Sequence, residues 1–387
     1  CLSKSDIIFI DNIHKKFNIQ DALHIKNLEK KTNHDVKAIE YFLKEKFSIS
    51  KNLLKLSEFL HFACTSDDIN NLAYALMLKD ARKKIILPLW KSLINVLKNI
   101  TLKYKNIPML SLTHGQPATP STIGKEIVNF YYRMYRQLCK LNNIEILGKI
   151  NGTTGNYNAH LAAYPNVNWH KISEEFIQSL DISWNPITTQ IEPHDYIAEF
   201  LSCISLFNTI LIDFNRDMWG YISRNYFNQK TVTHEIGSSI MPHKINPIDF
   251  EKSEGNLGLS NALMNHMIQK LPISRWQRDL SDSTVLRNLG VSIAYSVIAY
   301  RSTLLGINKL KINKTQLLQD LNNNWSILSE PIQTVMRCYG IENAYEKLKI
   351  LTRGKEINKH IMHNFIDTLK VPKIVKKRLK DITPANY

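Results

Sequence analysis

Apolar residues recur at every third or fourth position through most of this chain, which is the spacing of one face of an α-helix. The pattern covers five long stretches: residues 70–105, 121–147, 194–226, 284–306 and one that starts near Pro247. The stretch 194–226 is apolar nearly all round, so we expect it in the middle of a bundle. Pro88 should kink or split the first stretch. The pattern predicts an all-α fold with a central bundle of five long helices.

Shorter helical patterns flank these stretches, at residues 37–47 and 53–62 and again beyond residue 308. The last part is interrupted by prolines and glycines, namely Pro331, Gly340, Gly354 and Pro372. Such residues end helices, so we expect a separate small domain there. We therefore predict three domains: an N-terminal helical domain 1–64, a central bundle 65–307 and a C-terminal helical domain 308–387.

Composition narrows the classes of protein. At 387 residues and 44% hydrophobic content, the chain fits an ordinary globular protein with a large core. It has no uninterrupted run of about 18 uncharged apolar residues, so we predict no membrane span. Its five cysteines are scattered and lack CxxC spacing, which favours reduced thiols in the cytoplasm and disfavours structural zinc. Because the chain starts at Cys1 without a signal segment, we expect that an upstream piece of the natural chain is missing.

The formal net charge of +16 admits a nucleic acid, a membrane surface or a small polyanionic substrate as partner. The lysines are spread along the chain among asparagines and isoleucines, without an RNA-binding motif. We interpret most of the excess as solvated surface, and a nucleic-acid partner is the minor alternative.

The segment 234–256 concentrates the polar chemistry. Gly237 precedes two hydroxyl side chains, Ser238 and Ser239, in a loop that can bend and present backbone N–H groups to an anion. Asn246 and Pro247 then suit the N-cap and first position of a helix, with carboxylates in its first turn. Helix N-termini receive anions, so this loop is a candidate carboxylate site. A surface loop that merely caps a helix is the alternative.

Two further stretches are rich in functional groups. His114 lies in the turn Thr-His-Gly-Gln-Pro, where its imidazole could serve as a general acid or simply satisfy a backbone carbonyl. Residues 274–287 hold three arginines, two of them Arg278 and Arg287, together with acids and hydroxyls. The planar guanidinium suits phosphate and carboxylate groups. The alternative is an intramolecular Arg/Asp network, which we favour for Arg275.

The stretch from Ser238 to Asn246, Ser-Ser-x-Met-Pro-x-Lys-x-Asn, resembles the signature loop of the fumarase/aspartase superfamily. With His243 before the lysine and the arginine-rich stretch, the chain is most similar to adenylosuccinate lyases. That resemblance implies the three-domain superfamily fold, whose central bundles combine in a homotetramer with sites shared between subunits. It implies elimination of fumarate from adenylosuccinate and from succinylaminoimidazole carboxamide ribotide (SAICAR), without metal or cofactor. Family members carry an upstream Arg-Tyr pair on the nucleotide, which this sequence lacks.

The resemblance also assigns residues. His114 corresponds to the general acid and Ser238 to the general base. The substrate-binding residues would be Asn33, His34, Asp35, Thr65, Ser66, Gln190, Lys244, Asn246, Arg278, Ser283 and Arg287. His61 and Glu251 would play supporting roles. Two alternatives remain: another fumarate-releasing enzyme such as argininosuccinate lyase, or a structural relative without turnover.

Overall fold

The computed structural model describes residues 2–230, 240–241 and 243–387 and is mostly helical. The chain divides into two compact units. The first unit comprises Cys1–Ile86, Leu141–Ser202 and Leu263–Gly290, and the second comprises Leu87–Lys140, Cys203–Ala262 and Val291–Tyr387. These units interleave segments that are distant in sequence, whereas the predicted domains follow the chain. The three-domain division therefore stays a prediction.

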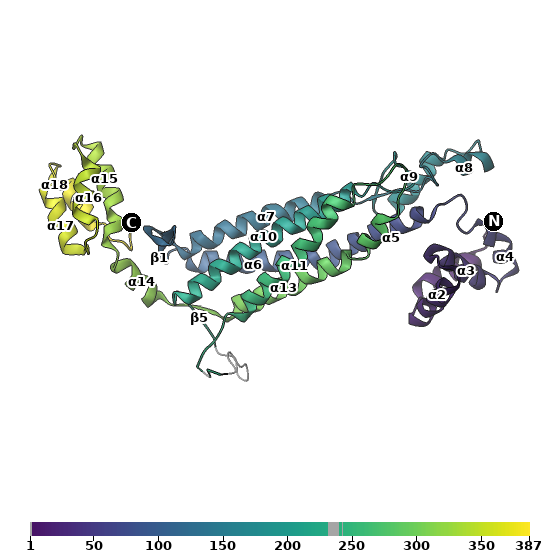
Figure 1. Ribbon diagram of the computed structural model, residues 1–387, viewed down its shortest axis with the longest axis horizontal. Helices are drawn as coiled ribbons and strands as arrows, with labels where there is room; N and C mark the ends of the chain where they lie inside the picture. Colours follow the sequence, from purple (N-terminus) through teal and green to yellow (C-terminus); the bar gives the residue numbers. More distant parts are fainter. Residues whose placement is uncertain (1, 231–239, 242) are drawn as a thin grey trace. The chain divides into compact units, whose positions relative to one another are not determined.

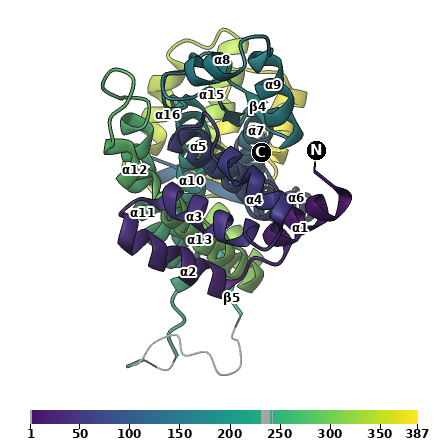
Figure 2. The same ribbon diagram turned by 90° about the vertical axis from the view of Figure 1, so that its right-hand side faces the viewer.

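The first unit begins with short helices. They are α1 Lys4–Lys15, α2 Ile19–Thr32, α3 Asp35–Phe47, α4 Lys51–Leu56 and a 3₁₀ turn Ser57–Phe59, followed by α5 Ser66–Ala81 and a π turn Arg82–Ile86. Helices α2 and α3 pack against each other (Figure 2). The unit also contains β3 Leu147–Gly148, α8 Asn158–Ala163, α9 Trp169–Ser179, β4 Ser183–Trp184 and α12 Ser281–Leu286. Strands β3 and β4 pair in parallel.

The second unit contains α6 Leu87–Tyr104, β1 Pro108–Thr113, β2 Gln116–Thr122, α7 Ile123–Asn143, β5 Phe227–Gln229 and β6 Leu310–Ile312. It ends with α14 Lys314–Asn322, the 3₁₀ turn Trp325–Leu328, α15 Ser329–Cys338, α16 Ala344–Thr352, α17 Lys359–Thr368 and α18 Lys373–Asp381. The long helices α10 Asp195–Ser223, α11 Ile248–Lys270 and α13 Leu289–Lys309 contribute residues to both units, as does α7 through residues 141–143.

In the second unit, α6, α7, α10, α11 and α13 run side by side (Figure 1). Trp90 of α6 stacks on Phe207 of α10 with ring centroids 3.8 Å apart, and Phe130 of α7 meets Phe214 edge-on at 5.4 Å. All four rings are buried, so aromatic packing holds α10 between its neighbours. This is the central position that its apolar circumference predicts.

Helix α10 nevertheless carries two buried amides, Asn208 and Asn215, seven residues apart. Tyr300 Oη donates to Asn208 Oδ1 at 2.6 Å, while Asn215 Nδ2 donates to Ser253 Oγ at 2.9 Å and Thr303 Oγ1 donates to Asn215 Oδ1 at 3.0 Å. Buried amides need partners, so these bonds fix the register of α10 against α11 and α13.

The long helices differ from the predicted ones mainly at their interruptions. The stretch 70–105 is interrupted by a π turn just before Pro88, where the sequence predicts a kink or a split. The stretch 284–306 is two helices, α12 and α13. A hairpin of β1 and β2 fills the connection between α6 and α7, where the sequence indicated only a turn. The fold is therefore mostly helical with three small two-stranded sheets among the described residues.

The hairpin packs against the C-terminal helices of the same unit. Leu110 of β1 is buried in a cluster with Leu321, Trp325 and Ile332. Thr119 of β2 hydrogen-bonds to the Glu330 carboxylate on α15. A buried leucine and a charge-assisted hydrogen bond thus attach the hairpin to the C-terminal helices.

Three helical stretches, Ser66–Tyr104, Asp195–Ser223 and Ser281–Lys309, are long and apolar enough to cross a membrane by length and composition. Their mean hydropathy is high, although the sequence has no uninterrupted run of about 18 uncharged apolar residues. In the second unit, α10 buries Phe207, Leu211 and Phe214 against other helices. Core packing thus accounts for much of its apolar content, and the lack of a span stays a prediction.

Candidate active site

His114 lies at the tip of the β1–β2 hairpin. Strand residues Thr113 and Gln116 pair across a two-residue loop, His114-Gly115, whose φ angles are +53° and +73°. Two consecutive positive φ values match the twist of adjoining strands in tight hairpins. Gly115 adopts such an angle freely, but His114 does so at a conformational cost. The imidazole is exposed, and backbone strain of this kind is frequent at functional positions.

The described part of the signature loop leads into α11. Lys244 is exposed, and its N–H donates to the Met241 carbonyl at 3.0 Å. Asn246 is half-buried and α11 begins at Ile248, two residues further on. Ser238, the predicted base, lies outside the described residues.

Glu251 lies in the first turn of α11, as predicted for a carboxylate at the positive end of the helix dipole. Its Oε1 accepts a hydrogen bond of 3.0 Å from the Trp219 indole. A supporting role beside His114 stays a prediction.

Two predicted substrate-binding segments meet in the first unit. His34 is the N-cap of α3, where its Nδ1 accepts from the Lys37 N–H at 3.2 Å. Its Nε2 lies 3.4 Å from the Ser66 hydroxyl at the start of α5. Asn33 ends α2 in a left-handed conformation, with φ of +51°. The turns that cap α2 and α3 therefore also bring His34 to Ser66, so capping and a substrate role are compatible.

The start of α5 is fixed by a buried ion pair. Asp68 Oδ2 accepts from the Thr65 N–H at 2.8 Å and the Gly152 N–H at 3.1 Å, while Oδ1 accepts from the Asn151 N–H at 3.0 Å. Lys149 Nζ lies 2.8 Å from the same Oδ1 as an ion pair whose alignment falls outside hydrogen-bond geometry. Both side chains are completely buried. Thr65 is thus held by a carboxylate that also anchors the loop 149–152.

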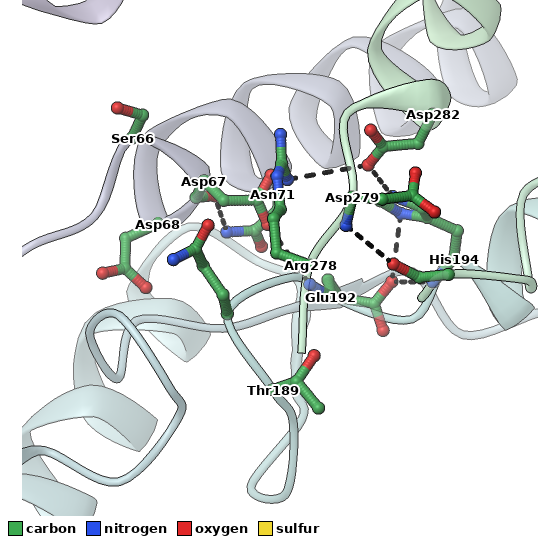
Figure 3. A network of polar contacts seen from close by, with 12 residues as sticks. Ser66, Asp67, Asp68, Asn71, Thr189, Glu192, His194, Arg278, Asp279 and Asp282 are labelled. Atoms are coloured by element: carbon green, nitrogen blue, oxygen red, sulfur yellow. Dashed lines mark hydrogen bonds and ion pairs between the residues drawn. The ribbon is translucent and has the colours of Figure 1, made fainter. Parts of the chain in front are cut away.

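Five residues form a closed set of contacts that we call the Arg278 ring (Figure 3). Arg278 Nη1 lies 3.2 Å from Asp67 Oδ1 and 3.6 Å from Asp282 Oδ2. His194 Nε2 lies 3.2 Å from Asp282 Oδ2, and the His194 N–H donates to Glu192 Oε2 at 2.7 Å. The Glu192 N–H closes the ring by donating to Asp67 Oδ2 at 3.3 Å.

The carboxyls of the ring differ in their electrostatics. Burial raises the pKa of Asp67, although the charges of Lys149 and Arg278 oppose the rise. Burial likewise raises the pKa of Glu192 against the attraction of His194. Burial also acts on Asp282, but there the hydrogen bond with His194 and the charge of Arg278 outweigh it and lower the pKa. Asp282 is therefore the ring carboxyl that is held most firmly in its charged form.

A cavity of about 50 Å³ opens beside the ring, and four predicted contacts line it: Asp35, Arg278, Ser283 and Arg287. The structure thus brings Asp35, one of the three predicted contacts Asn33, His34 and Asp35, to the same cavity as the arginine-rich stretch 274–287. Tyr74 also lines the cavity; burial raises its pKa, against the charge of Arg287.

Two predicted residues lie elsewhere in the unit. Gln190 Nε2 donates to the Thr153 carbonyl at 3.0 Å, and His61 adopts a φ of +60°.

The sequence did not point to several buried members of this site: Asp67, Lys149, Glu192, His194 and Asp282. The helical pattern 194–226 predicts that His194 lies at the start of a helix. Its carbonyl does accept the first hydrogen bonds of α10, but its ring also contacts Asp282. Arg275 pairs with Asp279, at 3.6 Å through its guanidinium and at 3.0 Å through its backbone N–H, as the Arg/Asp alternative expected. A second and more buried Arg/Asp network centres on Arg278.

Within residues 2–230, 240–241 and 243–387, no three His, Cys, Asp or Glu side chains are arranged to hold a metal ion. The four described cysteines, Cys64, Cys139, Cys203 and Cys338, are free thiols. Burial raises the pKa of Cys64 to about 11, so the thiol next to Thr65 stays protonated.

Comparison with known proteins decides the family. A lyase family model matches residues 2–260, and an adenylosuccinate lyase C-terminal model matches residues 274–387. Adenylosuccinate lyase of Buchnera aphidicola subsp. Acyrthosiphon pisum (strain APS) is 72% identical over 382 residues, covering 99% of this chain and 84% of the relative. The chain belongs to the adenylosuccinate lyase family. The adenylosuccinate lyase of Escherichia coli (strain K12) is 64% identical over 379 residues, covering 98% of this chain and 83% of the relative.

Two solved structures share the fold of this adenylosuccinate lyase family member. A fumarate lyase from Mesorhizobium sp. BNC1 superposes with a TM-score of 0.80 at 15% identity, covering 100% of this chain and 87% of that chain. The 3-carboxy-cis,cis-muconate lactonizing enzyme from Pseudomonas putida gives 0.77 at 18% identity, covering 96% and 82%. The mostly helical, fumarate-lyase-like fold that the signature loop predicted is confirmed, and the argininosuccinate lyase alternative falls away.

Proposed function

We propose that this chain removes fumarate from adenylosuccinate to give AMP, and from SAICAR to give the corresponding aminoimidazole carboxamide ribotide. The observation that carries the proposal is family membership: a carbon–nitrogen lyase family matches the chain from end to end at high identity. The same reasoning supports a place in purine nucleotide synthesis and a cytoplasmic location, and the free thiols are compatible with a reducing compartment.

The elimination needs one acid and one base. Ser238 takes the proton from the succinyl carbon, and that electron pair forms the double bond of fumarate. The carbon–nitrogen bond breaks as His114 gives a proton to the departing nitrogen. An imidazole that titrates near neutrality suits the acid role. The exposed position of the His114 imidazole at the tip of a strained hairpin supports the assignment.

Charge builds on a substrate carboxylate as the proton leaves. Lys244 and Asn246, beside the N-terminus of α11, are assigned to that carboxylate. An ammonium and helix-end N–H groups stabilise the developing negative charge more strongly than the ground state. Ser238 requires activation by nearby donors, positive charge or loop closure, because a serine hydroxyl is far too weak an acid to ionise unaided.

The remaining contacts divide between the two ends of the substrate. Arg278, Ser283 and Arg287 are assigned to the nucleotide phosphate, for which guanidinium groups are well shaped. Thr65 and Ser66 are assigned to the succinyl group. The other predicted contacts are Asn33, His34, Asp35 and Gln190, supported by His61 and Glu251. The support for this division is that Arg278, Ser283, Arg287 and Asp35 line one cavity while His34 contacts Ser66.

We propose further that the chain works as a homotetramer with shared sites. Helix α13 exposes Val291, Ile298 and Leu305, spaced by seven residues, with 46%, 43% and 56% of each side chain accessible. Apolar side chains in a heptad stripe on a long helix are typical of helix-to-helix association. No nucleic acid or membrane partner is part of the proposal.

The deciding experiment follows the ultraviolet absorbance of adenylosuccinate with wild type, His114→Ala and Ser238→Ala. Wild type should release AMP and fumarate, and each variant should lose about 10²- to 10⁴-fold in kcat. His360→Ala, which removes an exposed imidazole from α17, is the matched control and should match wild type. A folded but inert wild type would contradict the proposal and favour a structural relative without turnover.

A further inference from the structure

Arg278 is held from two sides before any ligand arrives. Its side chain is 24% exposed, and the two carboxylates that it contacts, Asp67 and Asp282, are 8% and 5% exposed. Both contacts are made through Nη1, a hydrogen bond of 3.2 Å to Asp67 and an ion pair of 3.6 Å with Asp282. A guanidinium carries five N–H donors in one plane, and fixing one edge of that plane fixes the direction of the rest.

Through Asp282, a third segment, the loop before α10, also helps to position Arg278. His194 binds Asp282, Glu192 binds the His194 backbone, and the Glu192 N–H returns to Asp67. Asn185 Nδ2 also donates to Glu192 Oε1 at 3.0 Å. The ring therefore ties together the start of α5, the loop before α10 and the segment before α12. Residues that lie far apart in the sequence jointly determine where one guanidinium sits.

The Arg278 ring contains more acidic than basic side chains, which is unusual beside a cavity that receives an anion. Three carboxyls surround one guanidinium and one imidazole, so the ring does not add positive potential to the cavity. The ring instead fixes the position and orientation of the Arg278 side chain. A long, flexible arginine side chain loses much conformational freedom when it binds, and a side chain already fixed by buried partners loses less. This arrangement exchanges some electrostatic attraction for preorganisation.

We propose that the Arg278 ring is a positioning device for substrate: Asp282, His194 and Glu192 hold the guanidinium of Arg278 in the orientation that receives an anionic phosphate group at the cavity. The inference rests on the proposed function, in which Arg278 contacts the nucleotide. It assigns Asp282, His194 and Glu192 as positioning residues that act through Arg278. They affect binding of the phosphate end of the substrate, not the proton transfers at the succinyl end.

The test uses the full chain with Asp282→Asn and Glu192→Gln. Each substitution removes one carboxylate charge and keeps the shape of the side chain. We expect KM for adenylosuccinate to rise about 10- to 100-fold, because a binding group that is misplaced by about 1 Å can lose that much. We expect kcat to change less than about threefold. The inhibition constant of inorganic phosphate, used as a competitive probe, should rise in parallel with KM.

Arg275→Ala is the matched control, since that exposed arginine lies on the same segment outside the ring and should leave KM unchanged. Folding is checked by circular dichroism and thermal melting. Folded ring variants with wild-type KM and wild-type phosphate inhibition would overturn the inference, and so would a fall in kcat at constant KM. If Asp282→Asn does not fold, Glu192→Gln carries the test. Failure of both to fold would assign the ring to stability alone.

The same data separate the inference from the proposed function. If wild type does not cleave adenylosuccinate, the proposed function fails, whereas phosphate binding to wild type and ring variants, measured by calorimetry, still tests the ring. If Arg278→Ala binds substrate and phosphate like wild type, the contact with the nucleotide fails and the ring has no role in recognition. If Arg278→Ala is weakened but the ring variants are not, only the positioning inference fails.

Discussion

Lys149 and Asp68 show what a single pair of residues contributes in this protein. Both are completely buried and lie 2.8 Å apart, and taking two charges out of water is costly. Hydrophobic side chains of similar volume could fill the same space without that cost. What they could not do is accept the backbone N–H groups of Thr65, Asn151 and Gly152, which Asp68 does. We infer that the pair is retained because it fixes the backbone around Thr65.

Replacing Lys149 by Met should lower the free energy of unfolding by about 3–5 kcal/mol, because it leaves the Asp68 carboxylate buried without its partner. The double variant with Asp68→Asn should recover part of that loss. Urea unfolding followed by circular dichroism measures both. Lys140→Met, an exposed lysine of α7, is the control and should change stability by less than about 0.5 kcal/mol. Equal losses in the single and double variants would show that the charge pair itself matters little.

Among the elements, the β1–β2 hairpin determines where His114 lies. It carries His114 at its tip, and it packs against the C-terminal helices of its unit. The C-terminal helices therefore support the hairpin that carries His114, the proposed general acid. A hairpin of this length is not stable alone, so its packing determines its geometry.

Leu110→Ala should both destabilise the protein and slow it. The side chain is 1% exposed, and removing a buried leucine side chain costs about 2–5 kcal/mol. We expect kcat to fall more than KM rises, because the hairpin positions the acid and not the nucleotide. Thermal melting and steady-state kinetics at a temperature where the variant is folded provide the test. Leu102→Ala on α6, where the leucine is 58% exposed, should change neither, and an unaltered kcat in folded Leu110→Ala would separate the hairpin core from catalysis.

On the scale of the whole molecule, the predicted site residues fall in both compact units. The second unit contains His114, Lys244, Asn246 and Glu251. The first unit contains the predicted contacts at residues 33–35, at Thr65 and Ser66, and in the arginine-rich stretch 274–287. The proposed tetramer would complete each site with segments from three subunits. Exposed heptad leucine, isoleucine and valine side chains on α13 offer the surface for such association.

Mixing inactive His114→Ala with inactive Ser238→Ala should therefore restore activity. If the two residues of one site come from different subunits, about one quarter of sites in a random equal mixture contain both intact side chains. Activity is measured after mild dissociation and reassociation, with each variant mixed with itself as control. Ile298→Asp, which puts a charge into the α13 stripe, should yield smaller species in light scattering and abolish the rescue. Tetramers that never regain activity would place both residues on one subunit.

Much of the fold could be predicted because helical periodicity is a local property of the sequence. The central position of α10 followed from its apolar circumference, and the break before α6 followed from Pro88. The hairpin was missed because its strands lack alternating apolar positions: β2 is largely polar and exposed or half-buried. Residue type and resemblance predict site roles for motif-borne residues such as His114, Lys244 and Arg278, and those roles stay predictions.

The sequence by itself determined the helical architecture, the family and the identities of the groups that could do chemistry, because periodicity and motif spacing are read along the chain. Only the tertiary structure decided which distant residues meet. Contacts of the Arg278 ring and of the Lys149–Asp68 pair join positions that lie up to 211 residues apart in the sequence. No local pattern signals such contacts, since a buried Asp or His has the same letter as an exposed one. Their partners, and hence their charges and roles, are set by packing alone.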